Sequence, residues 1–133
     1  MRAAPQCPRS DLFGESVSIS SKHAIVGAVG GDSDLFDGTG AAYIFPLLGG
    51  GSWGTPTKVL APDGVANDKF GTSVSIDGYY AIVGSPFDTN TALNSGSAYI
   101  FTYPFTDEPV KLVASDGAAR DVFGFSVSVS GDY

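Results

Sequence analysis

Apolar and polar residues alternate in several short segments of the chain, and glycine-rich stretches separate these segments. In 16–20 the alternation places Val17 and Ile19 on one side and serines on the other, a period of two that predicts a strand. The same pattern returns at 73–77 and 126–130. No stretch keeps the i, i+3, i+4, i+7 spacing of an amphipathic helix over three turns, so the sequence predicts an all-β fold.

Four segments recur in the same order. Asp-x-Phe-Gly begins at positions 11, 68 and 121, so its copies are 57 and 53 residues apart. Ala-Ile-Val-Gly at 24 and 81, Ala-Tyr-Ile-Phe at 42 and 98, and Lys-x-x-Ala at 58 and 111 follow it. Each repeat therefore predicts four strands, named A to D, with a tight A–B turn, a long B–C loop rich in Gly, Asp and Asn, and a C–D loop rich in Pro and Gly.

Four-stranded antiparallel units at this period are typical of β-propeller blades. We expect an irregular segment at 1–10, a first blade at 11–67, a second at 68–120 and the first strand of a third at 121–133, an incomplete ring. Phe13, Phe70 and Phe123 are predicted to plug the space between blades. The glycines that follow them are expected to need a positive φ or a close contact. Stacked repeats bury their core against neighbours, so both ends should expose apolar faces that need further blades or self-association.

The chain resembles the FG-GAP repeat family from residue 11 onward. Phe-Gly is followed by Val-Gly-Ala at 26–28 and by Val-Gly-Ser-Pro at 83–86, closer to the short microbial form than to integrin α chains. The resemblance implies a propeller, an extracellular or cell-surface location and a ligand-binding face. The integrin-type calcium loop, Asp-x-Asp-x-Asp-Gly in the A–B hairpin, does not carry over, because the hairpins at 20–22 and 77–79 are too short.

Charge and cysteine content exclude several classes of protein. Fourteen acids against seven bases give a net charge of −7, and the lysines are scattered singly, so we expect no nucleic-acid partner. A single cysteine excludes an internal disulfide. No apolar run is long enough to span a membrane, and the first ten residues lack the apolar core of a secretion signal, so we expect any such signal to lie outside this chain.

The B–C loops hold the candidate calcium ligands. They are Asp32, Asp34 and Asp37 in the first repeat, and Asp88, Asn90 and Asn94 in the second. Calcium takes 6–8 oxygen ligands, and alternating carboxylates in a Gly-rich loop supply several of them. Ordinary turn chemistry uses the same residue types, and both interpretations remain open at this point.

An up-and-down blade places the B–C loop and the D–A connection on one side of the disc. The acids and aromatics predicted to gather on this face are Phe36, Asp63, Asp68, Phe87, Asp116 and Asp121. In the family that the chain resembles, this face meets ligands. Such a rim suits a carbohydrate, a metal-bridged ligand or a basic patch on a protein. The alternative is a solvated rim of turns.

The sequence favours a non-enzymatic adhesion or recognition module over an enzyme. The chain has no Gly-x-Ser-x-Gly nucleophile motif, and His23, the one histidine, aligns with Tyr80 and is expected to fill a structural position. The second hypothesis is a propeller spacer without a ligand. The third, a carbohydrate-active propeller, would need a pair of loop carboxylates at a fixed separation.

Overall fold

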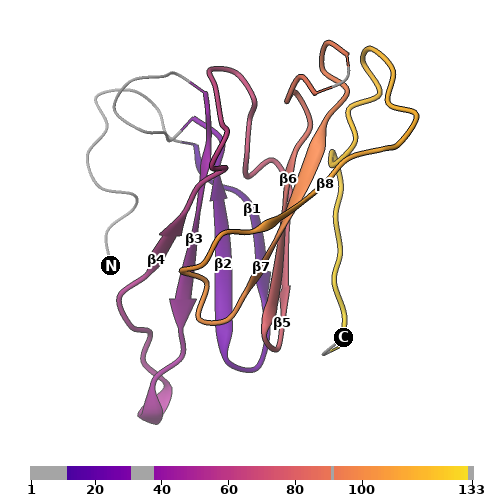
Figure 1. Cartoon of the computed structure of the whole chain (residues 1–133). Coiled ribbons are helices and arrows are strands. Elements are labelled where there is room, and N and C mark those ends of the chain that lie inside the picture. Colours follow the sequence, from indigo (N-terminus) through magenta and orange to yellow (C-terminus); the bar gives the residue numbers. More distant parts are fainter. Residues whose placement is uncertain (1–11, 31–37, 91, 132–133) are drawn as a thin grey trace.

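The computed structural model describes residues 12–30, 38–90 and 92–131, and in this part of the chain it confirms the all-β prediction. Two four-stranded antiparallel sheets lie side by side, each with its strands in sequence order (Figure 1). The first sheet comprises β1 (Phe13–Ile19), β2 (His23–Ala28), β3 (Ala41–Pro46) and β4 (Thr57–Val59). The second comprises β5 (Val74–Asp77), β6 (Tyr80–Ser85), β7 (Ser97–Thr102) and β8 (Val110–Leu112). A 3-10 turn at Gly49–Gly51 precedes β4.

Tight turns join the first two strands of each sheet, as the sequence predicted. In the second sheet Asp77 pairs with Tyr80, so Gly78 and Tyr79 form the turn. Gly78 has a φ of 58°, the left-handed conformation that such a turn demands and that glycine adopts most easily. The loop after β6 and the connections after β4 and β8 lie at the opposite end of the sheets (Figure 1).

The core lies between the two sheets. Val74 and Ile76 on β5 are only 7% and 3% exposed, because they pack against the first sheet. Phe70 is fully buried in the same cluster and makes edge contacts with Tyr99 and Phe101 of its own sheet. The predicted role of Phe70 as a plug between blades is therefore confirmed.

Small residues let the neighbouring sheets approach each other closely. Ser16 Oγ donates to the carbonyl oxygen of Gly71 at 2.8 Å, and Ser18 Oγ accepts from the backbone N–H of Ile76 at 3.2 Å. A Cβ on Gly27 would overlap the Gly71 carbonyl, so this position has room for glycine alone. The alternation on β1 therefore directs its serines toward the next repeat, where they form hydrogen bonds.

The third repeat begins as an extended segment that runs beside β5 (Figure 1). Its contacts reproduce those between the two sheets: Ser73 Oγ donates to the Gly124 carbonyl at 3.0 Å, and Val129 N–H donates to Ser75 Oγ at 3.1 Å. Within the described residues this segment has no ladder partner and forms only an isolated bridge at Phe123. The predicted first strand of a third repeat is therefore an extended segment, and no strand is assigned to it among the described residues.

The two outer faces carry exposed apolar side chains, as predicted. Val17 and Ile19 are 67% and 68% exposed, although they occupy the same positions on β1 as the buried Val74 and Ile76 on β5. Phe125, in the extended segment, is also exposed. No helix in the described ranges is long and apolar enough to cross a membrane.

Candidate functional site

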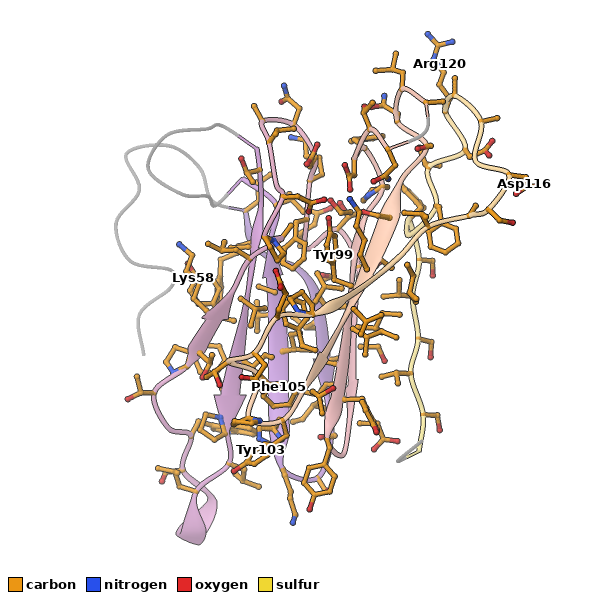
Figure 2. All side chains as sticks on the ribbon, in the orientation of Figure 1. Lys58, Tyr99, Tyr103, Phe105, Asp116 and Arg120 are labelled. Atoms are coloured by element: carbon orange, nitrogen blue, oxygen red, sulfur yellow. The ribbon has the colours of Figure 1, made fainter. Side chains whose placement is uncertain are left out.

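Three loops at one end of the sheets form a continuous rim, the loop end, made of the described residues 61–70, 86–90 with 92–96, and 114–123. Main-chain hydrogen bonds join each loop to the next: Phe87 N–H donates to the Asp68 carbonyl at 3.2 Å, and Arg120 N–H donates to the Leu93 carbonyl at 2.8 Å. Figure 2 shows Asp116 and Arg120 on the outermost of these loops. Each loop is thereby held by its neighbour as well as by its own strands.

A polar cluster beneath the rim ties the first sheet to the second. Tyr99 on β7 is buried, and its hydroxyl donates to Asp63 Oδ1 at 2.6 Å and lies 3.2 Å from Asp88 Oδ2. Lys111, next to β7 on β8, forms ion pairs with both carboxylates and lies 2.8 Å from Asp88. Ser97 Oγ donates to Asp88 at 2.7 Å. Since Asp63 belongs to the connection that leaves the first sheet, the cluster joins two blades.

The cluster stabilises the ionised forms of its charged members. Burial alone would raise the pKa of Asp63, but the hydrogen bonds from Lys111 and Tyr99 outweigh it and lower that pKa. Burial likewise opposes the charge of Lys111, and the two carboxylates overcome it and raise the pKa of the ammonium group. The pKa of Tyr99 is raised by burial and by its bond to Asp63, so its hydroxyl remains a donor.

Asp68 is a second buried carboxylate, only 2% exposed, and it differs from Asp63 in having no cation bonded to it among the described residues. Its Oδ2 accepts from Val65 N–H at 2.9 Å, and its carbonyl oxygen accepts from Ser85 Oγ at 3.1 Å. Burial, together with the charges of Asp88 and Asp63, raises the pKa of Asp68 to about 6. This carboxyl group is therefore a structural acid that titrates near neutral pH.

Of the predicted ligand face, Asp68 is buried, whereas Asp63, Phe87, Asp116 and Asp121 are exposed. Asp63 belongs to the polar cluster and Asp68 lies beside it. Asp121 occupies the place of Asp68 in the next repeat, and its Oδ2 likewise accepts a backbone N–H, from Ala118 at 2.8 Å. Phe36 and the first calcium candidates, Asp32, Asp34 and Asp37, lie outside the described residues.

In the second repeat the calcium candidates form bonds within the loop. Asp88 is ion-paired with Lys111. Asn90 Nδ2 donates to the Gly96 carbonyl at 3.0 Å. Asn94 has a φ of 54°, and its backbone N–H donates to Thr89 Oγ1 at 3.2 Å. Across the described ranges, no group of three or more His, Cys, Asp or Glu side chains could hold a metal ion. Calcium in the first repeat stays a prediction.

Sequence reasoning missed Lys111, Tyr99 and Ser97 as members of a site. The recurrence of the lysine and the tyrosine could have indicated them, because Lys58 and Tyr43 stand at the same places in the first repeat. The ammonium group lies over the tyrosine ring in both sheets, 5.7 Å from the centroid in the first and 5.5 Å in the second. A recurring Lys–Tyr pair on adjacent strands therefore belongs to the repeat itself.

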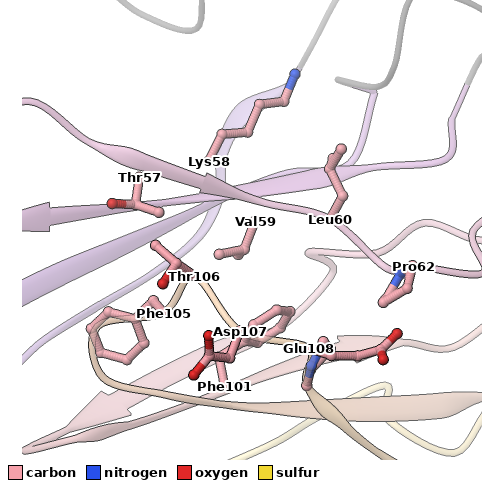
Figure 3. Close-up of a pocket in the computed structure, with 11 residues that line it drawn as sticks. Thr57, Lys58, Val59, Leu60, Pro62, Phe101, Phe105, Thr106, Asp107 and Glu108 are labelled. Carbon is pink, nitrogen blue, oxygen red and sulfur yellow. The ribbon is translucent and has the colours of Figure 1, made fainter.

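A groove with a cavity volume of about 400 Å³ lies between β4 and the loop before β8 (Figure 3). Phe101, Phe105 and Val59 contribute apolar lining, and Asp107 and Glu108 contribute two carboxylates. Lys58 also lines it but extends away from these acids in Figure 3. The groove therefore offers an apolar surface with acids beside it and no opposed catalytic groups among its lining residues.

Comparison with known proteins identifies the repeat. The profile of the FG-GAP repeat matches three segments, 4–45, 53–101 and 106–133, which together cover most of the chain. The second segment starts before β4 and ends within β7, so one sequence unit takes the last strand of one sheet and the first three of the next. The predicted blade boundaries at 11, 68 and 121 follow the sheets instead and stay a prediction. No curated protein matches the chain. The chain belongs to the FG-GAP repeat family, whose repeats build β-propeller-type modules.

Proposed function

We propose that this chain is part of a non-enzymatic adhesion or recognition module of an exported or cell-surface protein, and that the loop end meets the ligand. Membership of the FG-GAP repeat family supports both the module and its location. The ligand is a protein with a basic patch or a carbohydrate.

One observation carries the proposal: large apolar side chains are exposed between carboxylates on loops that hydrogen bonds hold in place. Val65, Phe87 and Leu93 are exposed, and they come from two loops joined through the Asp68 carbonyl. The ion-paired cluster lies beneath them. Exposed apolar groups with a polar surround are typical of interaction surfaces, and a rigid surface loses less conformational entropy on binding.

The exposed carboxylates decide which partners the surface favours. Asp116 and Asp121 stand on the outer loop, and Asp63 is half exposed beside Lys111. The whole chain carries a net charge of −7, so a basic partner would be attracted over a distance to the carboxylates of the loop end. A basic peptide or protein patch is therefore the first partner to test, and neutral glycans are the second.

The experiment is a binding screen of the full chain against basic and acidic peptide arrays and a glycan array. The test variant is the double substitution Phe87→Ser and Leu93→Ser, and the control is Leu48→Ser, an exposed leucine outside the loop end. We expect specific binding that the double variant loses and the control keeps. Binding that survives in the double variant, or no specific binding at all, would overturn the proposal, and the latter would favour the spacer.

A further inference from the structure

A second hollow lies at the tight-turn end, opposite the loop end. Its cavity volume is about 660 Å³, within the range of about 300–1,000 Å³ that is typical of ligand pockets. The A–B turns of both sheets contribute to it, Ser21 and Lys22 from the first and Asp77 to Tyr79 from the second. The pocket therefore spans the junction between two blades, as the polar cluster does at the other end.

Two tyrosines form an aromatic wall of this pocket. Tyr79 and Tyr103 are each more than half exposed, and their ring centroids are 5.7 Å apart. The backbone N–H of Tyr103 donates to the Tyr79 carbonyl at 2.8 Å. Behind the wall, the Tyr103 ring contacts Phe105 at 5.8 Å and His23 at 5.9 Å (Figure 2 labels Tyr103 and Phe105). Residues of both sheets therefore contact the Tyr103 ring and hold the aromatic wall in place without a ligand.

The polar groups at this pocket have unused bonding capacity. Lys22 is exposed, and its ammonium group has no ion-pair partner in the described part of the chain. Neither tyrosine hydroxyl has a hydrogen-bond partner there. Asp77 uses Oδ2 to accept from Gly131 N–H at 2.8 Å. His23 Nδ1 is buried without a partner among the described residues, an arrangement that lowers stability unless a donor or acceptor reaches it.

Charge narrows the chemistry of the ligand. Burial, and then the charge of Lys22, lowers the pKa of His23, so the imidazole is neutral at pH 7. Lys22 is then the one permanent cation among the residues that line the pocket, and Asp77 is the one carboxylate among them. A ligand that fits must offer an anionic group to Lys22, an apolar face to the tyrosines and hydroxyls to the remaining acceptors.

We propose that this pocket binds an acidic sugar, a pyranose ring that carries a carboxylate, between the A–B turns of adjacent blades. The C–H face of the ring stacks on Tyr79 and Tyr103, and the carboxylate pairs with Lys22. Asp77 accepts from ring hydroxyls. The proposal is independent of the one for the loop end, because the two sites share no residue and lie at opposite ends of the sheets.

The test is a titration of the full, ¹⁵N-labelled chain with digalacturonate, and with lactose as the neutral comparison, followed by NMR chemical shifts. We expect saturable shifts at the turns around positions 21–23 and 77–79 with digalacturonate, and weaker binding of lactose. Lys22→Gln removes the charge from an exposed turn and should weaken digalacturonate binding about tenfold or more. Tyr79→Ala should weaken the binding of both sugars.

Lys69→Gln is the matched control, since it removes a lysine at the loop end and should leave the affinity unchanged. Circular dichroism of each variant verifies that the fold is intact. The proposal is overturned if digalacturonate gives no saturable shifts, if the shifts lie at the loop end, or if Lys22→Gln binds digalacturonate as tightly as the parent chain. A Tyr79→Ala variant that binds normally would also overturn it, because the aromatic wall would then have no part in binding.

Discussion

Asp68 should make the stability of the two-blade unit fall as the pH rises from about 4 through about 6. Its carboxyl group is buried beside the carboxylates of Asp63 and Asp88, and Lys111 bonds to those two and not to Asp68. The perturbation is Asp68→Asn, because the amide oxygen can still accept from Val65 N–H while the charge is gone. The substitution thus removes the titration and keeps the shape.

The magnitude follows from the pKa of about 6 in the folded chain and the ordinary value of about 3.9 in the unfolded one. The folded state holds its proton to a higher pH, so it binds more protons than the unfolded state between these two values. Stability contributed by protonated Asp68 is therefore fully present at low pH and is lost as the pH rises. Between pH 5 and pH 8 the loss amounts to about 1.4 kcal/mol.

His23 acts in the opposite direction over the same range. Its pKa is lowered in the fold, so the unfolded chain binds the proton first and stability falls as the pH drops below about 6.5. The free energy of unfolding of the parent minus that of Asp68→Asn isolates Asp68, because the histidine contribution cancels. Asp121→Asn is the control, since Asp121 holds the equivalent place and is exposed.

The assay is urea denaturation at half-unit steps from pH 5 to pH 8, with the parent and both variants under one buffer and salt condition. We expect the free energy of unfolding of the parent, minus that of Asp68→Asn, to fall by about 1.4 kcal/mol from pH 5 to pH 8. The parent thus loses stability relative to the variant as the pH rises. This change should exceed any change for Asp121→Asn, which removes an exposed carboxylate. A constant difference for Asp68→Asn would refute the assignment of the raised pKa to this buried carboxyl group.

Three further results are expected. Lys111→Met should lower the free energy of unfolding by about 2 kcal/mol in urea at pH 7, because Asp88 stays buried without its cation; a loss below about 0.5 kcal/mol would contradict the role of the cluster. Gly27→Ala should destabilise by about 1–3 kcal/mol, since its Cβ meets the Gly71 carbonyl of the next sheet. Gly84→Ala presses on the Gly124 carbonyl of the C-terminal extended segment and on Ser73 Oγ, and its thermal midpoint should fall less; equal falls would mean that this segment packs as firmly as a sheet. Millimolar calcium should raise the thermal midpoint by several degrees over EDTA if the first B–C loop is a calcium site, and identical midpoints would leave its aspartates as turn residues.

Much of the fold could be predicted because the same sequence pattern occurs in each repeat, so each structural feature is indicated more than once. The alternation in 16–20 recurs in 73–77, and both segments form strands with their serines toward the following repeat. The glycine after each phenylalanine was expected to have a positive φ, and Gly14, Gly71 and Gly124 have values of 97°, 97° and 88°. These features depend on neighbours in sequence and on a strand period of two, so the sequence alone contains them.

The third repeat shows where local pattern stops being sufficient. Residues 126–130 have the same alternation as 16–20, yet the structure assigns no strand there. A strand needs a ladder partner as well as a propensity, and the described residues offer this segment only serine hydroxyls and an isolated bridge. The alternation therefore determined the extended backbone, and the available neighbours decided the pairing.

The candidate sites depended on the tertiary structure even more strongly. Aspartates and glycines in loops look alike in sequence whether they bind a ligand or make a turn, and only the fold shows that Asp88 is bonded to Lys111 and that Asp68 is buried beside it. Likewise, Lys22 and Tyr79 come from separate repeats and meet at one pocket because the sheets pack side by side. The sequence by itself determined the repeat, its strands and the close approach of its backbones, since these follow from periodicity and side-chain size. Which charges meet across the junction of two blades was decided by tertiary packing, because electrostatic and hydrogen-bond energies depend on distances between residues far apart in the chain.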